Sequence, residues 1–302
     1  PCAMGLATPT SIMVATGRAA ELGVLFRKGD ALQSLQDARL IAFDKTGTLT
    51  EGRPEVADVL LGEGVDQEAL MAQVASLQTL SEHPLASAML RASKAARLPV
   101  TGFQVHPGLG VQGTVGGAHL MVGSAKLMHQ QDIEIEALSL KAEGLAEAGK
   151  TLVYVACDGQ VAAVLGIADQ IKPSTLPALK ALRAAGLELA MITGDTPETA
   201  RAIADRLGIT HVIAGVMPDG KLNAIKELQT QGAVAFVGDG INDAPALAQA
   251  DVGLAIGTGT DIAVEAADVV LASGSLMGVA RAVTISRATM RNIRQNLGWA
   301  FG

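Results

Sequence analysis

The positions of hydrophobic residues divide the chain into a repeating part and an irregular part. Apolar runs with the pattern of buried strands occur at 39–43, 187–192, 233–237, 252–256 and 268–271. Apolar residues recur at helical spacing over 174–185, 197–207, 219–230 and 242–249, and also over 18–38 with a break at Gly29-Asp30. Strands that alternate with helices in this way predict an α/β fold, a doubly wound parallel sheet with helices on both faces.

The pattern changes between the first strand and the second. Helical periods at 66–79 and 84–97 are followed by short, glycine-punctuated strands between 100 and 123. A helix near 134–148 comes next, and Asp158-Gly159 between two apolar runs is a strong hairpin signal. These features predict a separate α+β unit inserted into the parallel-sheet domain, with 51–54 and 169–173 as its connectors.

Both ends of the chain are apolar. Residues 1–17 and 295–302 contain no charge, and each stretch is shorter than the ~20 residues that a helix needs to span a bilayer. Cations flank both stretches on their inner side: Arg18, Arg27, Lys28, Arg281, Arg287, Arg291 and Arg294. If the ends belong to truncated membrane helices, the positive-inside tendency would place the residues between them in the cytoplasm. Buried amphipathic helices at the two ends of a soluble protein are the alternative.

The amino-acid composition argues against one class of function, nucleic-acid binding. The 302-residue chain has a net charge of −7 and only 2% aromatic residues, so we expect neither a basic face nor a base-stacking surface for nucleic acid. Its two cysteines, Cys2 and Cys157, are too few for a disulfide framework and suit a reducing compartment. The sequence therefore predicts no nucleic-acid partner.

The strongest chemical signal is Asp44-Lys45-Thr46-Gly47-Thr48-Leu49-Thr50, which directly follows the first apolar strand. An aspartate at the carboxyl end of such a strand lies where open α/β sheets keep their active sites. Gly47 and small hydroxyl residues allow a tight turn whose amides can face a phosphate. Asp44 could therefore attack the terminal phosphorus of ATP and carry the phosphoryl group as an acyl phosphate. A turn with an ordinary solvated aspartate is the alternative.

Two further motifs follow later strands. Thr193-Gly194-Asp195 comes after the second strand and offers a hydroxyl and amides for phosphoryl oxygens. Gly238-Asp239-Gly240-Ile241-Asn242-Asp243 comes after the third strand, and its carboxylates and amide suit Mg²⁺. Lys221, on the helix between these motifs, can offset the negative charge of phosphate and Asp44. Each motif alone could be a turn, but their shared place at strand ends predicts one site for phosphoryl transfer.

Thr46 indicates what happens to the acyl phosphate. A phosphatase built around Asp44 would need a general acid two residues on, and threonine cannot act as one near neutral pH. We therefore expect the acyl phosphate to persist until another element brings a base. A free-standing soluble phosphohydrolase of the same fold is the alternative from a different class.

These motifs together resemble the cytoplasmic core of a P-type ATPase, a pump of the haloacid-dehalogenase-like fold group. The resemblance implies a phosphorylation domain at 24–52 and 168–275, interrupted by a nucleotide-binding domain at 53–167. It also implies a truncated membrane helix with its extension at 1–23 and a helix leading to the next membrane span at 276–302. The chain would then be the cytoplasmic portion of an integral membrane protein, working with actuator and transmembrane domains of the same protein.

The same resemblance implies roles for the motif residues. Asp44 would be phosphorylated, and Mg²⁺ would be held by Asp44, the Thr46 carbonyl and Asp239, with Asp243 ordering the magnesium site. Thr193, Lys221 and Asn242 would hold phosphate. The catalytic site would also include the remaining motif residues, Lys45, Gly194 and Asp195.

The inserted block carries Ser81-Glu82-His83-Pro84-Leu85 and Gly108-Leu109-Gly110-Val111-Gln112-Gly113. The glycine pattern alone is weak, and His83 alone could simply cap a helix. Together the two segments resemble the nucleotide site of heavy-metal-transporting P-type ATPases. That resemblance implies that Glu82 and His83 contact adenine, that Gly108 and Gly110 line its pocket, and that ATP is bound there.

The first residues bear on the transported ion. Cys2 lies in an uncharged stretch where a soft thiolate could bind Cu(I), although a buried inert cysteine is the alternative. The segment from Pro1 to Val14 resembles the copper(I) subgroup of these pumps, which implies Cu(I) as the transported ion and Cys2 as part of an incomplete metal site. A pump for Ag(I), Zn(II) or Cd(II) remains an alternative.

Overall fold

The computed structural model describes residues 2–83, 85–217, 220–239, 243–257 and 265–301 of the 302-residue chain. The described residues form two compact units. The first unit comprises 1–51, 171–197 and 204–302, and the second comprises 52–170 and 198–203. The main segment of the second unit, 52–170, is therefore an insertion in the chain of the first unit.

The first unit is built on a sheet whose seven described strands lie in the order β1-β13-β12-β11-β2-β9-β10. Only the edge strand β1 runs antiparallel to its neighbour; the other pairings are parallel. The strands are β1 (Val24–Phe26), β2 (Leu40–Asp44), β9 (Glu188–Ile192), β10 (His211–Ile213), β11 (Val234–Gly238), β12 (Val252–Ile256) and β13 (Val269–Leu271).

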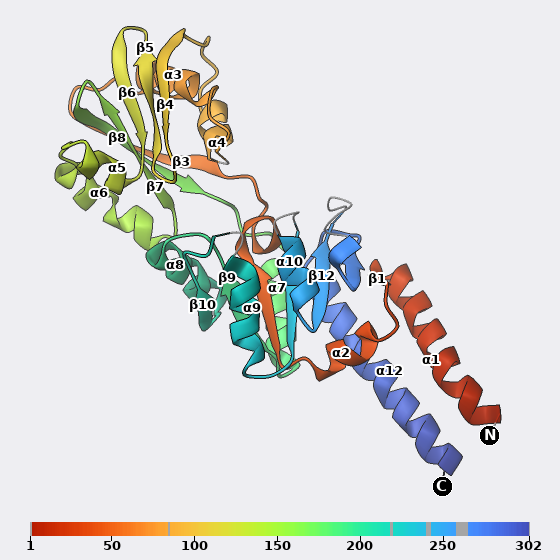
Figure 1. Ribbon diagram of the computed structural model, residues 1–302. Coiled ribbons are helices and arrows are strands. Elements are labelled where there is room, and N and C mark those ends of the chain that lie inside the picture. The colour runs from red at the N-terminus through yellow and green to blue at the C-terminus, as the bar shows by residue number, and fades with distance from the viewer. Residues whose placement is uncertain (1, 84, 218–219, 240–242, 258–264, 302) are drawn as a thin grey trace. The chain divides into compact units, whose positions relative to one another are not determined.

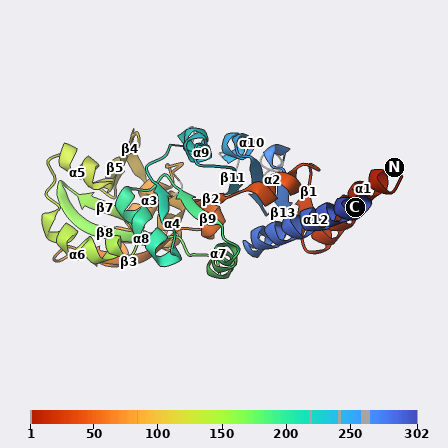
Figure 2. The same cartoon turned by 90° about the horizontal axis from the view of Figure 1, so that it is seen from below.

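Helices cover both faces of this sheet, as strands buried on both sides require. The helices of this unit are α1 (Cys2–Glu21), α2 (Ala31–Asp37), α7 (Thr175–Ala184), α9 (Lys221–Gln229), α10 (Ala244–Gln249) and α12 (Met277–Phe301), and α8 (Pro197–Leu207) is divided between the two units. Figure 2 shows α9 and α10 on one side of β11 and β2 and α7 on the other. Leu228, Phe236 and Leu247 belong to the apolar core between the sheet and α9 and α10. The central strands are therefore held rigidly, which fixes the loops at their carboxyl ends.

Helices α1 and α12 pack against each other at the two ends of the chain (Figure 1). Arg281 and Arg287 of α12 donate hydrogen bonds to the carbonyls of Leu22 and Ala185, at 3.3 and 2.6 Å. These bonds anchor α12 to the end of α1 and to the residue after α7. Neither α1 nor α12, nor any shorter helix in the described part of the chain, combines the length and hydropathy of a membrane-crossing segment.

The second unit is an antiparallel sheet of six described strands in the order β3-β8-β7-β6-β5-β4. Its strands are β3 (Glu55–Leu61), β4 (Val100–His106), β5 (Gly110–Val115), β6 (Ala118–Gly123), β7 (Thr151–Cys157) and β8 (Gln160–Ala168). Its helices are α3 (Gln67–Gln78), α4 (Ala86–Arg91), α5 (Ala125–Gln130) and α6 (Glu136–Glu147). Entry and exit strands β3 and β8 pair directly, so the unit begins and ends at one place.

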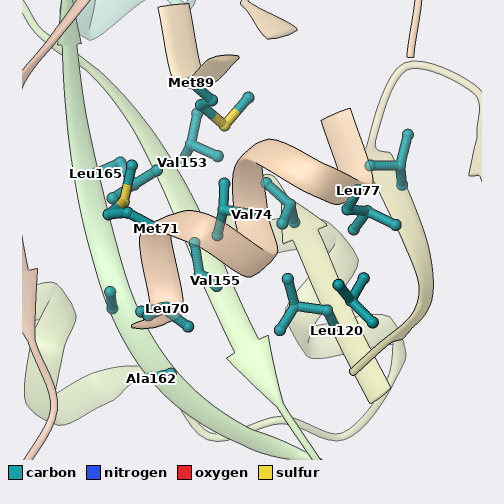
Figure 3. Packing of buried hydrophobic residues seen from close by; sticks show 14 of the residues in the cluster. Leu70, Met71, Val74, Leu77, Met89, Leu120, Val153, Val155, Ala162 and Leu165 are labelled. Carbon is teal, nitrogen blue, oxygen red and sulfur yellow. The ribbon is translucent and has the colours of Figure 1, made fainter. Parts of the chain in front are cut away.

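The core of this unit lies around α3. Val74 and Leu77 are fully buried and pack with Leu120, Val155 and other apolar residues of the sheet (Figure 3). A second cluster on the other side of the sheet joins α5 and α6 to Tyr154. Each cluster consists of residues from the second unit alone, so this unit has its own hydrophobic core.

Most expected elements are confirmed, including the hairpin at Asp158-Gly159, where both residues have positive φ (49° and 80°). The helix expected over 18–38 with a break at Gly29-Asp30 is confirmed up to Glu21 and again after the break, where α2 begins at Ala31, but the expectation is wrong for the residues between. Helix α1 ends at Glu21, Gly23 adopts φ +76°, and the next residues pair with β13 as strand β1. The helix expected over 84–97 is confirmed only for α4, because Arg97 donates hydrogen bonds to the carbonyls of the loop after it.

Candidate functional site

Three neighbouring parallel strands end at the same edge of the first sheet. Strand β2 lies between β11 and β9, with Asp44 paired to Ile192 and Phe43 paired to Val237. The residues that directly follow these strands are therefore brought together, although they lie far apart in the sequence. This edge is where parallel α/β sheets place ligands.

Three carboxylates and one ammonium group meet at this edge. Asp44, Asp239 and Asp243 each offer a carboxylate oxygen, and these oxygens lie within 4.8 Å of one another. The Lys221 Nζ lies 2.7 Å from Asp44 Oδ1 and 2.6 Å from Asp243 Oδ1. The Asp239 amide donates a hydrogen bond of 3.2 Å to Asp243 Oδ2. The expected grouping of these four side chains is present in the structure.

Burial changes the pKa values of the ionisable groups in this cluster. Burial raises the pKa of Asp44 to about 7, and the nearby Asp243 adds to the rise while Lys221 opposes it. Burial and Asp243 also raise the pKa of Asp239. Burial lowers the pKa of Lys221, but Asp44 and Asp243 outweigh it, so that its pKa stands above the ordinary value. Three acids and one ammonium group leave an excess of negative charge that a divalent cation would neutralise.

Two glycines make room for the carboxylates. A Cβ atom at Gly47 would lie 1.6 Å from Asp239 Oδ2, and one at Gly238 would lie 2.6 Å from Asp243 Oδ2. Gly47 also has φ +76°, a conformation that favours glycine. Any side chain at these positions would push the carboxylates away from the site.

The loop after Asp44 is a single wide turn, η1 (Lys45–Leu49). The Thr50 amide and hydroxyl both donate to the Lys45 carbonyl at 3.1 Å and close the turn. The Thr48 hydroxyl is buried and has no hydrogen-bond partner among the described residues. A buried hydroxyl without a partner costs free energy, so this atom is available to a bound group.

The remaining predicted residues of this site have different surroundings. Lys45 is buried, and its Nζ lies 2.5 Å from Asp195 Oδ2, so the motifs after β2 and β9 are joined by an ion pair. The Thr193 side chain is buried and accepts a hydrogen bond of 3.1 Å from the Asp195 amide, whereas Thr46 and Gly194 are exposed. Asn242 and the side chain of Cys2 lie outside the part of the chain that the structure describes.

The expected nucleotide residues lie in the second unit. Glu82 and His83 follow α3 and are exposed, and the Leu85 amide donates a hydrogen bond of 3.2 Å to His83 Nδ1. This bond favours neutral His83 with its proton on Nε2, and partial burial lowers the pKa of the imidazole. Helix α3 runs antiparallel to β5, with Gln73 against Val115 and Leu77 against Gly113. The chain after α3 is therefore directed toward the end of β5 where Gly110 lies.

Gly108 and Gly110 differ from each other. Gly108 has φ +70° and open space where a side chain would be, in the turn between β4 and β5. Gly110 faces Gly123 across the β5–β6 pair, and a Cβ atom there would lie 2.3 Å from the Val122 carbonyl oxygen. Close packing of two strands therefore accounts for Gly110, and it is a reason that the sequence motif does not reveal.

One set of contacts at the Asp44 loop could not be predicted from the sequence. Lys172 Nζ donates a hydrogen bond to the Gly47 carbonyl, and the Thr175 hydroxyl donates one of 2.8 Å to the Leu49 carbonyl. Lys172 comes from the connector that returns from the second unit, and Thr175 is the first residue of α7, directly after it. A lysine beside Pro173 in that connector was the available signal, but nothing in the local pattern linked it to residue 47.

Comparison with known proteins identifies the fold. A family model described as haloacid dehalogenase-like hydrolase matches residues 38–251, which include all three strand ends of the site. The chain belongs to the haloacid dehalogenase-like hydrolase family. Members of this family use Mg²⁺, and the oxygens of Asp44, Asp239 and Asp243 are the hard ligands that this ion prefers.

This haloacid dehalogenase-like chain is similar over its whole length to parts of longer proteins. It is 56% identical to Copper-transporting ATPase 1 of Rhizobium meliloti (strain 1021), across 100% of this chain and 37% of that protein. It is 51% identical to the Probable copper-transporting ATPase PacS of Synechococcus elongatus, across 100% of this chain and 41% of that protein. The chain thus spans about two fifths of the length of these relatives.

Solved structures show the same arrangement of sheets. A crystal structure of a zinc-transporting PIB-type ATPase in the E2.Pi state matches 99% of this chain and 50% of its own, with 34% identity and a TM-score of 0.80. The catalytic CPx-ATPase domain CopB-B matches 89% of this chain and 98% of its own, with 26% identity and a TM-score of 0.69. The parallel haloacid dehalogenase-like sheet with a separate antiparallel sheet is therefore the fold of PIB-type ATPase catalytic regions.

Proposed function

We propose that this chain is the ATP-binding and phosphorylation core of a copper(I)-exporting P-type ATPase, which hydrolyses ATP through an aspartyl phosphate at Asp44. The observation that carries the proposal is the meeting of Asp44, Lys221, Asp239 and Asp243 at one sheet edge. Whole-length similarity to copper-transporting ATPases supports the choice of family member.

Phosphoryl transfer follows from the charges of this site. A carboxylate oxygen of Asp44 attacks the terminal phosphorus of ATP, the new O–P bond forms, and the bond to the β-phosphate oxygen breaks as ADP leaves. Asp44, Asp239 and the Thr46 carbonyl would hold Mg²⁺, with Asp243 ordering the site, and the ion would offset charge on the phosphoryl oxygens. Lys221 opposes the rise in the pKa of Asp44, which favours the ionised nucleophile, and its positive charge attracts the incoming phosphate.

The phosphate itself would be held by groups that follow β9 and β11 and by Lys221 at the start of α9. We assign this role to the Thr193 hydroxyl, the amides near Gly194, Lys221 and Asn242. The pair formed by Lys45 and Asp195 joins two of the loops involved, so it would keep them at a fixed spacing. Thr46, two residues after Asp44, offers no general acid, and we therefore propose that the acyl phosphate persists and that this chain alone hydrolyses ATP slowly.

The nucleotide would bind to the second unit. His83 is exposed and its Nδ1 is occupied by the Leu85 amide, so its Nε2–H and its ring would be available for hydrogen bonding and stacking with adenine. Gly108 leaves open space in the β4–β5 turn, and the chain after α3 is directed toward that end of β5. We therefore assign Glu82, His83, Gly108 and Gly110 to the adenine pocket.

The transported ion is proposed as Cu(I), with Cys2 as one soft ligand of a membrane site completed by the remaining transmembrane part of the pump. A zinc pump is the second possibility, because a zinc-transporting PIB-type ATPase structure matches 99% of the chain. The higher identity to copper-transporting ATPases, 56% against 34%, favours copper. Phosphorylation of the intact pump stimulated by Cu(I) or Ag(I), but not by Zn(II), is the expected result.

The decisive experiment is Asp44→Asn in the intact pump. We expect the substitution to abolish acid-stable labelling from [γ-³²P]ATP, because the amide cannot form an acyl phosphate. Asp37→Asn, at an exposed aspartate of α2 just before the same strand, is the matched control and should keep full labelling. Label that survives in Asp44→Asn would assign the phosphoryl acceptor to another residue. Rapid turnover of a phosphate ester by this chain alone would instead favour a soluble phosphohydrolase.

A further inference from the structure

The connector that returns from the second unit, together with the first residue of α7, holds the loop after Asp44 through hydrogen bonds. Thr50 and Ile171 form an isolated antiparallel bridge. The Lys172 amide donates a hydrogen bond of 3.0 Å to the Leu49 carbonyl, and the buried Thr175 hydroxyl donates one of 2.8 Å to the same oxygen. The outer half of the loop is therefore held by a segment more than 120 residues away in the sequence.

One side chain of the connector reaches further into the site. The Lys172 Nζ, on a half-buried residue, donates a hydrogen bond to the Gly47 carbonyl. Gly47 lies directly against Asp239, since a Cβ atom on it would be 1.6 Å from the carboxylate oxygen. The peptide that Lys172 holds is also next to Thr46, whose carbonyl we assign to Mg²⁺. The ammonium group thus fixes the spacing between the loop and Asp239.

The charge of Lys172 acts on the same carboxylates. Burial and Asp243 raise the pKa of Asp239, whereas Lys172, followed by Lys221, lowers it. The three clustered carboxylates and the two ammonium groups carry one net negative charge together. An incoming phosphoryl group is itself negative, so each positive charge at this edge favours its arrival.

We propose that Lys172 is a positioning residue for phosphoryl transfer: it holds the Gly47 carbonyl, sets the loop after Asp44 against Asp239, and adds a second positive charge to that of Lys221. This inference rests on the proposed function, because it assigns a further residue to the same site. It also gives the connector a role in the chemistry, beyond joining the two units.

Beryllofluoride, which mimics a phosphoryl group on an aspartate, tests this role without turnover. Its affinity for the 302-residue chain is measured by ¹⁹F NMR at saturating Mg²⁺ in wild type, Lys172→Met, Lys172→Gln and Lys172→Arg. We expect Lys172→Met to bind it about tenfold more weakly, because losing a residue that holds the ligands of a metal site typically costs about 10–100-fold. Lys172→Gln keeps a hydrogen-bond donor but no charge, so its affinity for beryllofluoride should lie between those of Lys172→Met and wild type. Lys172→Arg keeps both and should stay within about twofold of wild type.

Lys180→Met is the matched control, because Lys180 is an exposed lysine on α7, the helix that follows the connector, and its loss should leave the affinity unchanged. Equal affinities of wild type and Lys172→Met would overturn the role of Lys172 alone. If Lys172→Arg bound beryllofluoride as weakly as Lys172→Met, the proposed role would also be overturned, because the loss would then come from the packing of the lysine side chain and not from its charge. Failure of wild type to bind beryllofluoride would overturn the proposed function, and this inference with it.

Discussion

At the scale of single residues, Asp44 makes the stability of the metal-free protein depend on pH. Burial raises its pKa from 3.8 to about 7, so the folded state binds a proton more tightly than the unfolded state. The stabilisation from that proton is complete below pH ~4 and is lost as the pH rises through about 7. In EDTA we therefore expect the melting temperature of the wild-type chain to fall between pH 5 and pH 8, as followed by calorimetry.

The variant Asp44→Asn isolates this effect. Near pH 5 its melting temperature should be close to that of wild type, whereas at pH 8 it should be a few degrees above that of wild type. A change of about 1 kcal/mol in stability shifts the melting temperature of a domain this size by about 2–4 °C. Saturating Mg²⁺ should remove the wild-type deficit at pH 8 by neutralising the carboxylates. A wild type that is as stable as Asp44→Asn at pH 8 in EDTA would contradict the raised pKa.

The sequence predicted the acidic part of the site because Asp44, Asp239 and Asp243 each follow a strong apolar strand. Parallel strands end at one edge, so their terminal residues could be grouped without coordinates. Lys172 could not be placed in this way. It lies in a connector with no periodic pattern, and its contact with Gly47 depends on how the chain re-enters the first sheet. Residues that touch a site from irregular segments carry no comparable signal.

At the scale of elements, the β5–β6 pair depends on two facing glycines. A methyl group at Gly110 would meet the Val122 carbonyl at 2.3 Å and the backbone of Gly123 at 2.6 Å, and the backbone cannot give way as a flexible side chain could. We expect Gly110→Ala to destabilise the second unit by about 1–3 kcal/mol, the usual cost of overpacking. The free energy of unfolding in urea measures this change.

Gly144→Ala is the matched control for that prediction. Gly144 lies inside α6, and nothing lies within 4 Å of the position of its missing Cβ atom. Alanine there should stabilise the helix by about 0.5–1 kcal/mol, so the two substitutions should act in opposite directions. A neutral Gly110→Ala would mean that β5 and β6 are less closely packed than the structure shows.

Element type was predictable where a pattern was long and regular. Helices α3, α7 and α9 and strands β2, β9 and β11 all lie within a few residues of their expected positions. Strand β1 was missed because three residues are too short for a periodic signal, and its formation depends on pairing with β13. Helix α5 also lies outside every expected period, although Ser124 caps it by accepting a hydrogen bond from the Leu127 amide. The secondary structure of such short segments depends on pairing with distant strands and on local caps.

At the scale of the whole molecule, the residues proposed for phosphoryl transfer and those proposed for nucleotide binding belong to different units. The Asp44 cluster lies entirely in the first unit, and Glu82, His83, Gly108 and Gly110 lie entirely in the second. The sequence predicted an insertion from its change of pattern near residue 56. It could not show that β3 and β8 pair side by side, which brings the two ends of the insertion together.

This pairing makes the second unit a candidate for independent folding. Residues 52–170 contain both hydrophobic clusters of that unit, and the Arg53 amide donates a hydrogen bond of 3.0 Å to the Asp169 carboxylate at the point where the chain enters and leaves. We therefore expect residues 52–170 to fold as a separate protein and to bind ATP with the affinity of the 302-residue chain. Calorimetric titration of both proteins with ATP measures the comparison.

His83→Gln in either protein should weaken ATP binding by about tenfold, because losing one polar contact costs on the order of 1–1.5 kcal/mol. His129→Gln, at an exposed histidine of α5, is the matched control and should bind ATP as wild type does. Asp44→Asn in the longer chain should also leave ATP affinity nearly unchanged, since Asp44 belongs to the other unit.

Unchanged affinity in His83→Gln would remove His83 from the adenine pocket. Strong binding by the 302-residue chain with none by a folded 52–170 would mean that the second unit does not hold the nucleotide on its own.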